Sequence, residues 1–373
     1  MTLELRPWRG LEGFAAQAAA WDECLRARPI DPLCNAHAWT LAHARAFTPD
    51  ADVFGWTLVR ADGKPAGVLA LRREPSRGAL ALRRALFLAD GTFDSDYLEP
   101  PVAPGEERAA VRALMDAACR VRGLEALVLS GIPETSPFLR ELRAELDERG
   151  MPRRELPVAC LAAELAGSLD AFIATLKSRM RSKVRSALRN AASTGARVTW
   201  TARAEDVELH LADLFRLHEL RWQAEGRTGS FADPRRRAFY TDVAREALSH
   251  GQLRLARLER DGVVLASQLG LVAGDRYYQI QEGYDPAFEE ERVGVALRAL
   301  GLEDLMRAGV RSYDFMAGDA RHKRDWGGVD RPCTTVAFPL ARWRPRLTFA
   351  LRGRVDRWRA ARVSSEASGE AED

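Results

Sequence analysis

The sequence predicts an α/β protein of the α+β kind, with two similar lobes whose mixed, mainly antiparallel sheets are flanked by helices. Two β-rich hairpins with Asp-Gly turns, at 53–72 and 253–272, are the first observation behind this prediction. Helices precede each hairpin, and a strand, a helix and a further strand follow it. Because the repeat lies in the order of elements and not in residue identity, it indicates an internal duplication.

The first lobe is assigned to residues 1–155. Helices are expected over 13–26 and 35–46, before a hairpin that turns at Asp62-Gly63. The elements expected after the hairpin are a strand at 85–89, a helix over 106–122, a buried strand at 126–130 and a helix over 136–149.

The second lobe is assigned to residues 156–340 and repeats that order. Its second hairpin turns at Asp261-Gly262. The other expected elements are helices over 168–192, 204–225, 235–250 and 293–308 and strands at 196–200, 275–284 and 311–315. Residues 341–373 are expected to form a basic amphipathic helix and a disordered acidic tail.

Composition excludes several classes of protein. With 46% hydrophobic and 29% charged residues in 373, the chain is too apolar for a disordered protein and too long for a disulfide miniprotein. No apolar stretch is long enough to span a membrane and the N-terminus has no apolar leader, so a cytoplasmic protein is expected. The five cysteines form no CxxC pair and the six histidines have no ligand spacing, so no metal is expected.

The turn at 291–296 is the first candidate for chemistry. It lies after a strand and opens a helix at Gly294, where backbone N–H groups and the helix dipole can receive a diphosphate. Arg292 would add positive charge. The alternative is a glycine that only lets a helix pack on a sheet.

Several short blocks of this sequence, taken in order, resemble one family. They resemble the GNAT-type acetyltransferases associated with cellulose and exopolysaccharide biosynthesis (CelD-like), relatives of the Fem-type peptidoglycan aminoacyltransferases. The resemblance covers roughly residues 30–330. The blocks are Ser95–Tyr97, Ser130–Pro133, Arg181–Gly195, Arg221-Trp222, Asp261-Gly262 with Gln268, Tyr284-Asp285, Gly294–Leu297, Tyr313–Asp319 and His322–Gly327.

The resemblance implies tandem duplicated GNAT-like domains, the first without a working cofactor site. It implies acetyl-CoA or another acyl-CoA as co-substrate, and an acceptor that is a sugar nucleotide, a lipid-linked saccharide or a related envelope or exopolysaccharide precursor. In this sequence Val293 stands where the family often has Pro. The cofactor-binding residues implied are Arg292, Val293, Gly294, Val295 and Ala296.

The strand before this turn supplies candidates for proton transfer. Glu282 could take the proton of an acceptor amine, directly or through water, and Tyr284 could protonate the leaving thiolate. Strict alternation would place Tyr278, Ile280, Glu282 and Tyr284 on one face of the strand. The alternative is a pair of tyrosines in the core beside a glutamate at the rim.

Two further groups carry over from the resemblance. Lys323 follows Asp319 and lies among Arg321, His322 and Arg324, a cluster suited to a phosphate or carboxylate on the acceptor, and in Fem-type relatives the equivalent basic position faces substrate. The alternative is a solvated loop. Asp96 and Tyr97 resemble an Asp-Tyr pair that faces the cleft in the family, although an aspartate there could instead cap a turn.

The segment Lys177–Arg189 has six basic residues in thirteen and no acidic one, so an external anion is expected to bind it. The candidates are cofactor phosphates, a lipid-linked substrate, tRNA, a cyclic dinucleotide or anionic lipid. Arg221 and Trp222 could complete an acceptor pocket together with Gln268, or could simply pack.

Three functions remain open at this point. The first is an acyl-CoA-dependent N- or O-acyltransferase acting by direct attack on the thioester. The second is Fem-type aminoacyl transfer from tRNA, and the third is a non-catalytic regulator that binds an anionic ligand. The helix Arg342–Arg362 either docks on its own domain or lies on an anionic membrane, which would make the protein peripheral to the inner membrane. Nucleic-acid binding is otherwise not expected, because no basic motif is interleaved with aromatic residues.

Overall fold

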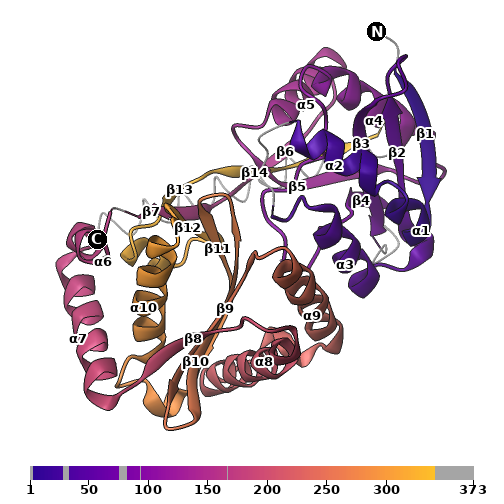
Figure 1. The fold of residues 1–373 in the computed structure, drawn as a ribbon. Helices are drawn as coiled ribbons and strands as arrows, with labels where there is room; N and C mark the ends of the chain where they lie inside the picture. Colours follow the sequence, from indigo (N-terminus) through magenta and orange to yellow (C-terminus); the bar gives the residue numbers. More distant parts are fainter. Residues whose placement is uncertain (1–2, 28–32, 75–81, 93, 166, 341–373) are drawn as a thin grey trace, which may run out of the picture. The chain divides into compact units, whose positions relative to one another are not determined.

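The computed structural model describes residues 3–27, 33–74, 82–92, 94–165 and 167–340, and it separates into two compact units (Figure 1). The first unit takes the described residues within 1–37, 48–158 and 333–373, and the second takes 38–47 and 159–332. Each unit is built on one seven-stranded sheet. The predicted two-lobed mixed α/β fold is therefore confirmed.

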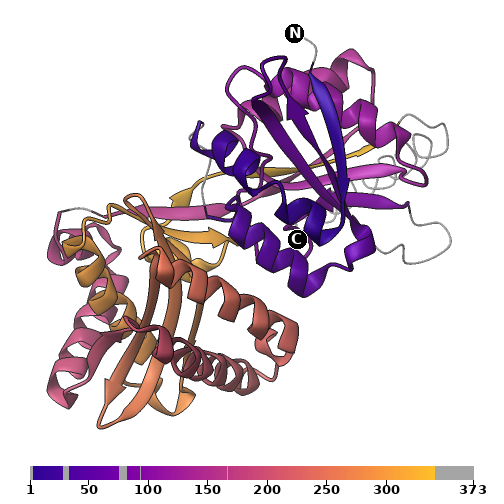
Figure 2. The same ribbon diagram turned by 45° about the vertical axis from the view of Figure 1, so that its right-hand side comes forward.

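The sheet of the first unit is mostly antiparallel, with one parallel pair, β4 and β5. Across the sheet the strands are β1 (Glu4–Arg9), β2 (Val53–Val59), β3 (Pro65–Glu74), β4 (Arg84–Phe87), β5 (Ala126–Pro133), β14 (Cys333–Pro339) and β6 (Arg154–Val158). Helices α1 (Gly10–Ala15) and α2 (Ala18–Arg26) contact β2 and β3, while α4 (Glu107–Arg120) packs on β3 and on α5 (Pro137–Glu148) (Figure 2).

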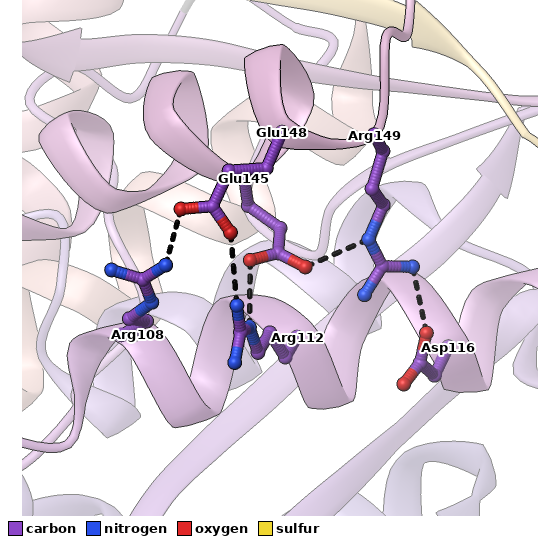
Figure 3. Close-up of polar contacts among 6 residues, drawn as sticks. All are labelled: Arg108, Arg112, Asp116, Glu145, Glu148 and Arg149. Carbon is purple, nitrogen blue, oxygen red and sulfur yellow. Dashed lines mark hydrogen bonds and ion pairs between the residues drawn. The ribbon is translucent and has the colours of Figure 1, made fainter.

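Helices α4 and α5 are joined by a network of ion pairs centred on Glu145 (Figure 3). Its carboxylate, only 5% exposed, accepts hydrogen bonds of 2.7 Å from both Arg112 Nε and Arg149 Nε. Arg149 also reaches Asp116 at 2.7 Å, and Arg112 reaches the more exposed Glu148 at 2.9 Å. Burial alone would raise the pKa of Glu145, but the two guanidinium groups lower it below 4.5.

We expect Glu145→Gln to lower the free energy of unfolding by about 1 kcal/mol, because charge-assisted hydrogen bonds become neutral ones and both arginines can still reach water. Because the pKa of Glu145 is lowered by folding, its ionised carboxylate stabilises the fold above pH 4.5. This stabilisation is lost as the pH falls through the pKa that Glu145 has in the folded state. The difference between variant and wild type should therefore shrink in urea titrations at acid pH. The exposed Glu148→Gln is the control, with a change below about 0.5 kcal/mol. A larger effect at Glu148 than at Glu145 would contradict this account.

The sheet of the second unit has β11 and β12 as its parallel pair. Its strands, in spatial order, are β13 (Val329–Asp330), β7 (Cys160–Glu164), β12 (Ser312–Ala317), β11 (Arg276–Tyr284), β10 (Val263–Ala273), β9 (Leu253–Arg260) and β8 (Arg197–Trp200). The predicted Asp-Gly hairpin joins β9 to β10. Asp261 (φ 50°) and Gly262 (φ 77°) are both left-handed there, as a two-residue type I′ turn requires.

Helices cover both faces of the second sheet. On one face α10 (Val293–Arg307) contacts β8 to β11 and packs against α6 (Leu169–Thr175) and α7 (Ser178–Thr194). On the other face α8 (Val207–Ala224) packs on β10 and β11, and α9 (Pro234–Ser249) packs on β9 (Figures 1 and 2). The remaining helices of this unit are α3 (His37–Phe47) and the short α11 (Arg321–Asp325).

The division between the units differs from the predicted 1–155 and 156–340 at two segments. Strand β14 follows the second unit in the chain but pairs with β5 and β6, which places it in the first sheet. Most of α3 groups with the second unit, where Trp39 makes an edge contact of 5.1 Å with Phe239. Each unit therefore contains a segment from outside its expected range.

The predicted continuous helix over 168–192 is wrong, because the structure has a break between α6 and α7. Leu176 and Lys177 have extended ψ values of 157° and 145° there. Buried Leu176 packs into the core. The guanidinium of Arg181 donates to the carbonyls of Ala174 and Leu176, so that the end of α6 is satisfied by a side chain. The predicted helix Arg342–Arg362 and the acidic tail lie outside the described residues. In the part of the chain that is described, every helix is too short or too polar to cross a bilayer.

Candidate active site

Strands β11 and β12 diverge and open the second sheet. They pair only at Arg276, Tyr277 and Tyr278, which lie opposite Ser312, Tyr313 and Asp314. From Gln279 onward β11 pairs with β10 alone. The backbone groups along this free edge, which a neighbouring strand would otherwise bond, can therefore bond a ligand.

Helix α10 begins beside this opening. Its N-cap Arg292 is left-handed (φ 60°), which turns the chain sharply into the helix at Val293. The N–H groups of Val293, Gly294 and Val295 bond to no other described residue, whereas that of Ala296 bonds to the Arg292 carbonyl at 2.9 Å. Three backbone donors and the positive end of the helix dipole therefore remain available to an anion.

A cavity of about 870 Å³ lies at this helix start. Its walls come from β10, β11, α7, α8, the first two turns of α10 and α11. Eight lysines and arginines line it against four acidic residues, so that the cavity is cationic overall. The basic residues are Lys177, Arg179, Lys183, Arg221, Arg292, Arg298, Arg321 and Arg324, and the acidic ones are Glu282, Glu289, Asp319 and Asp325.

Glu282 stands in this cavity as part of an ion-pair cluster. Arg298 of α10, only 5% exposed, donates to its Oε2, and Arg221 Nη1 lies 3.6 Å from its Oε1. Burial alone would raise the pKa of Glu282, but Arg298 and Arg221 lower it below the ordinary 4.5. Glu282 is therefore ionised at neutral pH and is a weak base.

Glu282 is also part of a buried network of hydrogen bonds. Gln268 donates to Glu282 Oε2 at 3.2 Å, and its own Oε1 accepts from the Tyr277 hydroxyl at 3.1 Å. The Tyr313 hydroxyl lies 3.2 Å from the same Gln268 oxygen and 3.1 Å from Gln279 Oε1. Gln268 was predicted to bind substrate, but here it is a buried positioning residue for Glu282.

This network corrects the predicted strand face. The register of β10 and β11 passes from Leu269–Gln281 to Gly270–Gln279, which leaves Ile280 as an extra residue in a bulge. The bulge reverses the alternation, so that Tyr277 shares a face with Glu282 and Gln268 bonds to both. Tyr278 and Ile280 do not line the cavity, contrary to the prediction.

Tyr284 lies at the mouth of α10. Gly294 faces its ring, and a Cβ on Gly294 would lie 3.4 Å from Tyr284 Cδ1. The Arg221 guanidinium lies 5.6 Å from the centre of the same ring. Partial burial raises the pKa of Tyr284 above 10, so its hydroxyl keeps its proton at neutral pH and can donate it.

Four of the five residues predicted to bind the cofactor lie at the cavity, and their role stays a prediction. Arg292, Val293, Gly294 and Val295 line the cavity, while Ala296 packs into the core with 2% of its surface exposed. Val293, which stands where the family that the sequence resembles often has Pro, does not prevent the helix from starting at this residue.

Lys323 was predicted to contact an anionic group of the acceptor, but the structure places its side chain elsewhere. Its ammonium group donates to the backbone carbonyls of Phe315 and Ala317, at 2.8 and 2.5 Å. Because Lys323 holds the turn after β12 and does not line the cavity, it is a positioning residue. Asp319 does line the cavity and pairs with Arg324 at 2.5 Å.

The four remaining predicted site residues have mixed outcomes. Arg221 lines the cavity, but Trp222 does not, and its indole N–H donates to His218 Nε2 at 2.9 Å. Tyr97, which is buried, and Asp96 belong to the first unit. There the Tyr97 carbonyl accepts a hydrogen bond of 2.7 Å from Asn35. Their assignment to a cleft stays a prediction.

The basic helix α7 splits its charges between two sides. Arg179 and Lys183 face the cavity one turn apart, and Asn190 on the same side donates to the Glu291 carbonyl at 3.4 Å. Arg185 and Arg189 are exposed and have no ion pair with any described residue. The buried face, with Met180 and Val184, packs against the α10 side of the core.

Among the cavity residues whose part the sequence did not indicate are Arg298 and His322. A signal for Arg298 existed, since it is the one charged residue among the first ten of this helix, and a lone buried cation needs a partner. His322 was counted only as a member of a basic cluster. It lines the cavity from α11, and loss of water around its ring lowers its pKa below 6.5.

Comparison with known proteins agrees with this geometry. Residues 178–324 match the family described as Acetyltransferase (GNAT) domain. No curated protein matches the chain. Among solved structures, FemX is 14% identical with a TM-score of 0.58, over 86% of this chain and 95% of that one.

Two further structures share the two-lobed fold. The C-terminal domain of a candidate lysylphosphatidylglycerol synthetase from Agrobacterium fabrum is 14% identical with a TM-score of 0.52, over 90% of this chain and 96% of that one. A tandem GNAT protein from the clavulanic acid biosynthesis pathway is 16% identical with a TM-score of 0.50, over 90% of this chain and 98% of that one. At such identities the likeness concerns the fold. Residues 178–324 therefore match the GNAT acetyltransferase domain family, and the chain as a whole shares the two-lobed fold of these solved structures.

Proposed function

We propose that the protein transfers an acyl group from acyl-CoA, with acetyl-CoA as the first candidate, to an amine or hydroxyl of an anionic acceptor. The observation that carries this proposal is the start of α10, where three free backbone N–H groups open into a cationic cavity. A diphosphate fits such a site because the amides and the helix dipole both favour negative charge. A regulator with a decayed turn would not need this open start.

The divergence of β11 and β12 would receive the acyl end of the donor. A backbone N–H on the free edge of β11 can donate to the thioester carbonyl and stabilise the oxyanion that forms during attack. Tyr284 would give its proton to the departing thiolate, in agreement with its raised pKa. Attack would be direct, without a covalent enzyme intermediate.

The acceptor we propose is a sugar nucleotide or lipid-linked saccharide of an envelope or exopolysaccharide pathway. The support is the basic lining of the cavity, to which α11 contributes Arg321 and Arg324, although each also has a carboxylate neighbour, Asp325 at 3.8 Å and Asp319 at 2.5 Å. Such precursors carry phosphate beside the reacting sugar, which these cations would recognise. We propose a cytoplasmic site of action, peripheral to the membrane where the acceptor is lipid-linked.

The second candidate is aminoacyl transfer from tRNA, as in Fem-type enzymes. Arg185 and Arg189 on α7, exposed and without an ion pair among the described residues, favour it, because they give α7 a second basic side outside the cavity. A tRNA-dependent enzyme would not need CoA to bind at α10. The two functions therefore differ in the donor that the protein binds.

Calorimetry with two donors tests the proposal. We expect micromolar binding of acetyl-CoA and at least about a 100-fold weaker affinity for S-acetylpantetheine, which lacks the nucleotide and the diphosphate. Equal affinities would show that the amides at α10 receive no phosphate. Binding of aminoacyl-tRNA with no binding of acetyl-CoA would favour the Fem-type function.

A further inference from the structure

Acyl transfer needs a group that removes the proton from the attacking amine or hydroxyl. The carboxylates that line the cavity are poorly suited to this at neutral pH. Three of them are ion-paired: Glu282 with Arg298, Asp319 with Arg324 at 2.5 Å, and Asp325 with Arg321 at 3.8 Å. The fourth, Glu289, is exposed on the turn before α10, and its side chain has no partner among the described residues that would hold it in place.

Two adjacent residues of α11, His322 and Lys323, have different surroundings. Lys323 turns back onto the carbonyls that end β12, while His322 lines the cavity and is exposed to solvent. His322 is the one histidine among the described residues that line this cavity. Imidazole is the side chain whose ordinary pKa lies nearest to neutral pH.

Charged groups on four elements act on His322. Arg298 of α10, Arg221 of α8 and Lys323 of α11 disfavour the imidazolium, while Glu282 of β11 favours it. Partial loss of water has the largest effect, and together these lower the pKa of His322 below 6.5. Above that lowered pKa the ring is neutral, which is the form that can accept a proton.

The geometry points to His322 as the residue that takes the proton of the attacking nucleophile, an inference that rests on the proposed acyl transfer. The nucleophile forms a bond to the thioester carbon as its N–H or O–H proton passes to the imidazole. The C–S bond then breaks, its electron pair stays on sulfur, and the thiolate takes the Tyr284 hydroxyl proton. The imidazolium returns its proton through solvent to the Tyr284 oxygen, which leaves both residues as they began. Glu282 and Arg298 shape the field around the ring.

The test uses the full chain with His322→Gln, which keeps a polar side chain at an exposed position. The matched control is His250→Gln, because His250 is exposed at the end of α9, outside the cavity. Thiol release from acetyl-CoA is followed with glucosamine 6-phosphate as the probe acceptor, across pH 5–9. The ring signal of His322, assigned by its loss in the variant, is titrated by NMR with and without acetyl-CoA.

We expect an NMR pKa below 6.5 for His322 and a shift of its signal on addition of acetyl-CoA. We expect His322→Gln to lower kcat/KM by about 100-fold or more. The variant should also lose the part of the pH–rate profile in which kcat/KM rises with pH through that pKa. Its Kd for acetyl-CoA should change less than about twofold. His250→Gln should behave as wild type.

Two results would overturn the assignment of His322. One is a signal that does not respond to bound acetyl-CoA, and the other is a variant that keeps both the rate and the rising limb. Absence of acetyl-CoA binding by the wild-type protein is a different outcome, because it defeats the proposed function itself.

Discussion

Replacing Gly294 by glutamate is expected to abolish acetyl-CoA binding while the protein stays folded. A Cβ at this position would meet only the edge of the Tyr284 ring, at 3.4 Å, which is ordinary contact. A carboxylate in the first turn of a helix also interacts favourably with the dipole, so stability should hold. The same carboxylate would bond the free amides of α10 and repel a diphosphate from them.

The measured effect should be at least a 100-fold increase in the Kd for acetyl-CoA by calorimetry, about 3 kcal/mol. Gly294→Ala is the matched control, since it adds the Cβ without the charge, and its Kd should stay within about tenfold of wild type. Thermal unfolding of both variants should resemble that of the wild type. If the glutamate variant binds acetyl-CoA as well as the alanine variant does, the helix start is not the phosphate site.

The parts of the site that lie close together in the chain could be predicted from the sequence. Glu282, Tyr284 and Gly294 fall within thirteen consecutive residues, and a strand, a turn and a helix start bring them to one place. The Asp-Gly turn at 261–262 was equally local, because few residues other than Gly and Asp tolerate both left-handed positions. Local chemistry was enough for these features.

Features that depend on distant partners could not be predicted in this way. Strand β14 pairs with β5, whose residues lie about two hundred positions earlier, and nothing within either segment specifies the other. The order of residues along β11 gives no sign of the bulge at Ile280, yet the bulge places Tyr277, and not Tyr278, on the face of the sheet that Glu282 shares. Lys323 shows the same limit, since its partners are carbonyl oxygens whose position only the fold determines.

Arg298→Met is expected to cause the largest loss of stability among these variants. Arg298 is 5% exposed and holds Glu282 together with Gln279, whose Oε1 lies 3.2 Å from Arg298 Nη2. Its removal leaves the Glu282 carboxylate with a hydrogen bond from Gln268 and with Arg221, 3.6 Å away, as its neighbouring cation. A largely buried charge that loses its main partner costs several kcal/mol. We expect the free energy of unfolding in urea to fall by about 3 kcal/mol.

The double variant Arg298→Met with Glu282→Leu separates loss of the pair from loss of packing. If the cost comes from the stranded carboxylate, the double variant should recover about 2 kcal/mol relative to Arg298→Met alone. The pH dependence gives a second check. In the wild type the pKa of Glu282 is lowered by folding, so the ionised carboxylate stabilises the fold above pH 4.5. This contribution disappears as the pH falls through the pKa that Glu282 has in the folded state.

Without Arg298 the pKa of Glu282 should rise, because burial, the largest influence on it, then lacks its main opposing charge. Arg298→Met should therefore be least stable relative to wild type near neutral pH and should approach it on acidification, when the stranded carboxylate can take a proton. A deficit that stays constant from pH 7 to pH 4 would mean that Arg298 contributes through packing against Phe315 and Trp326, whose rings its guanidinium overlies at 5.8 and 5.3 Å. In that case Glu282 would keep its place in the cavity without Arg298, and the ion pair would not be what positions it.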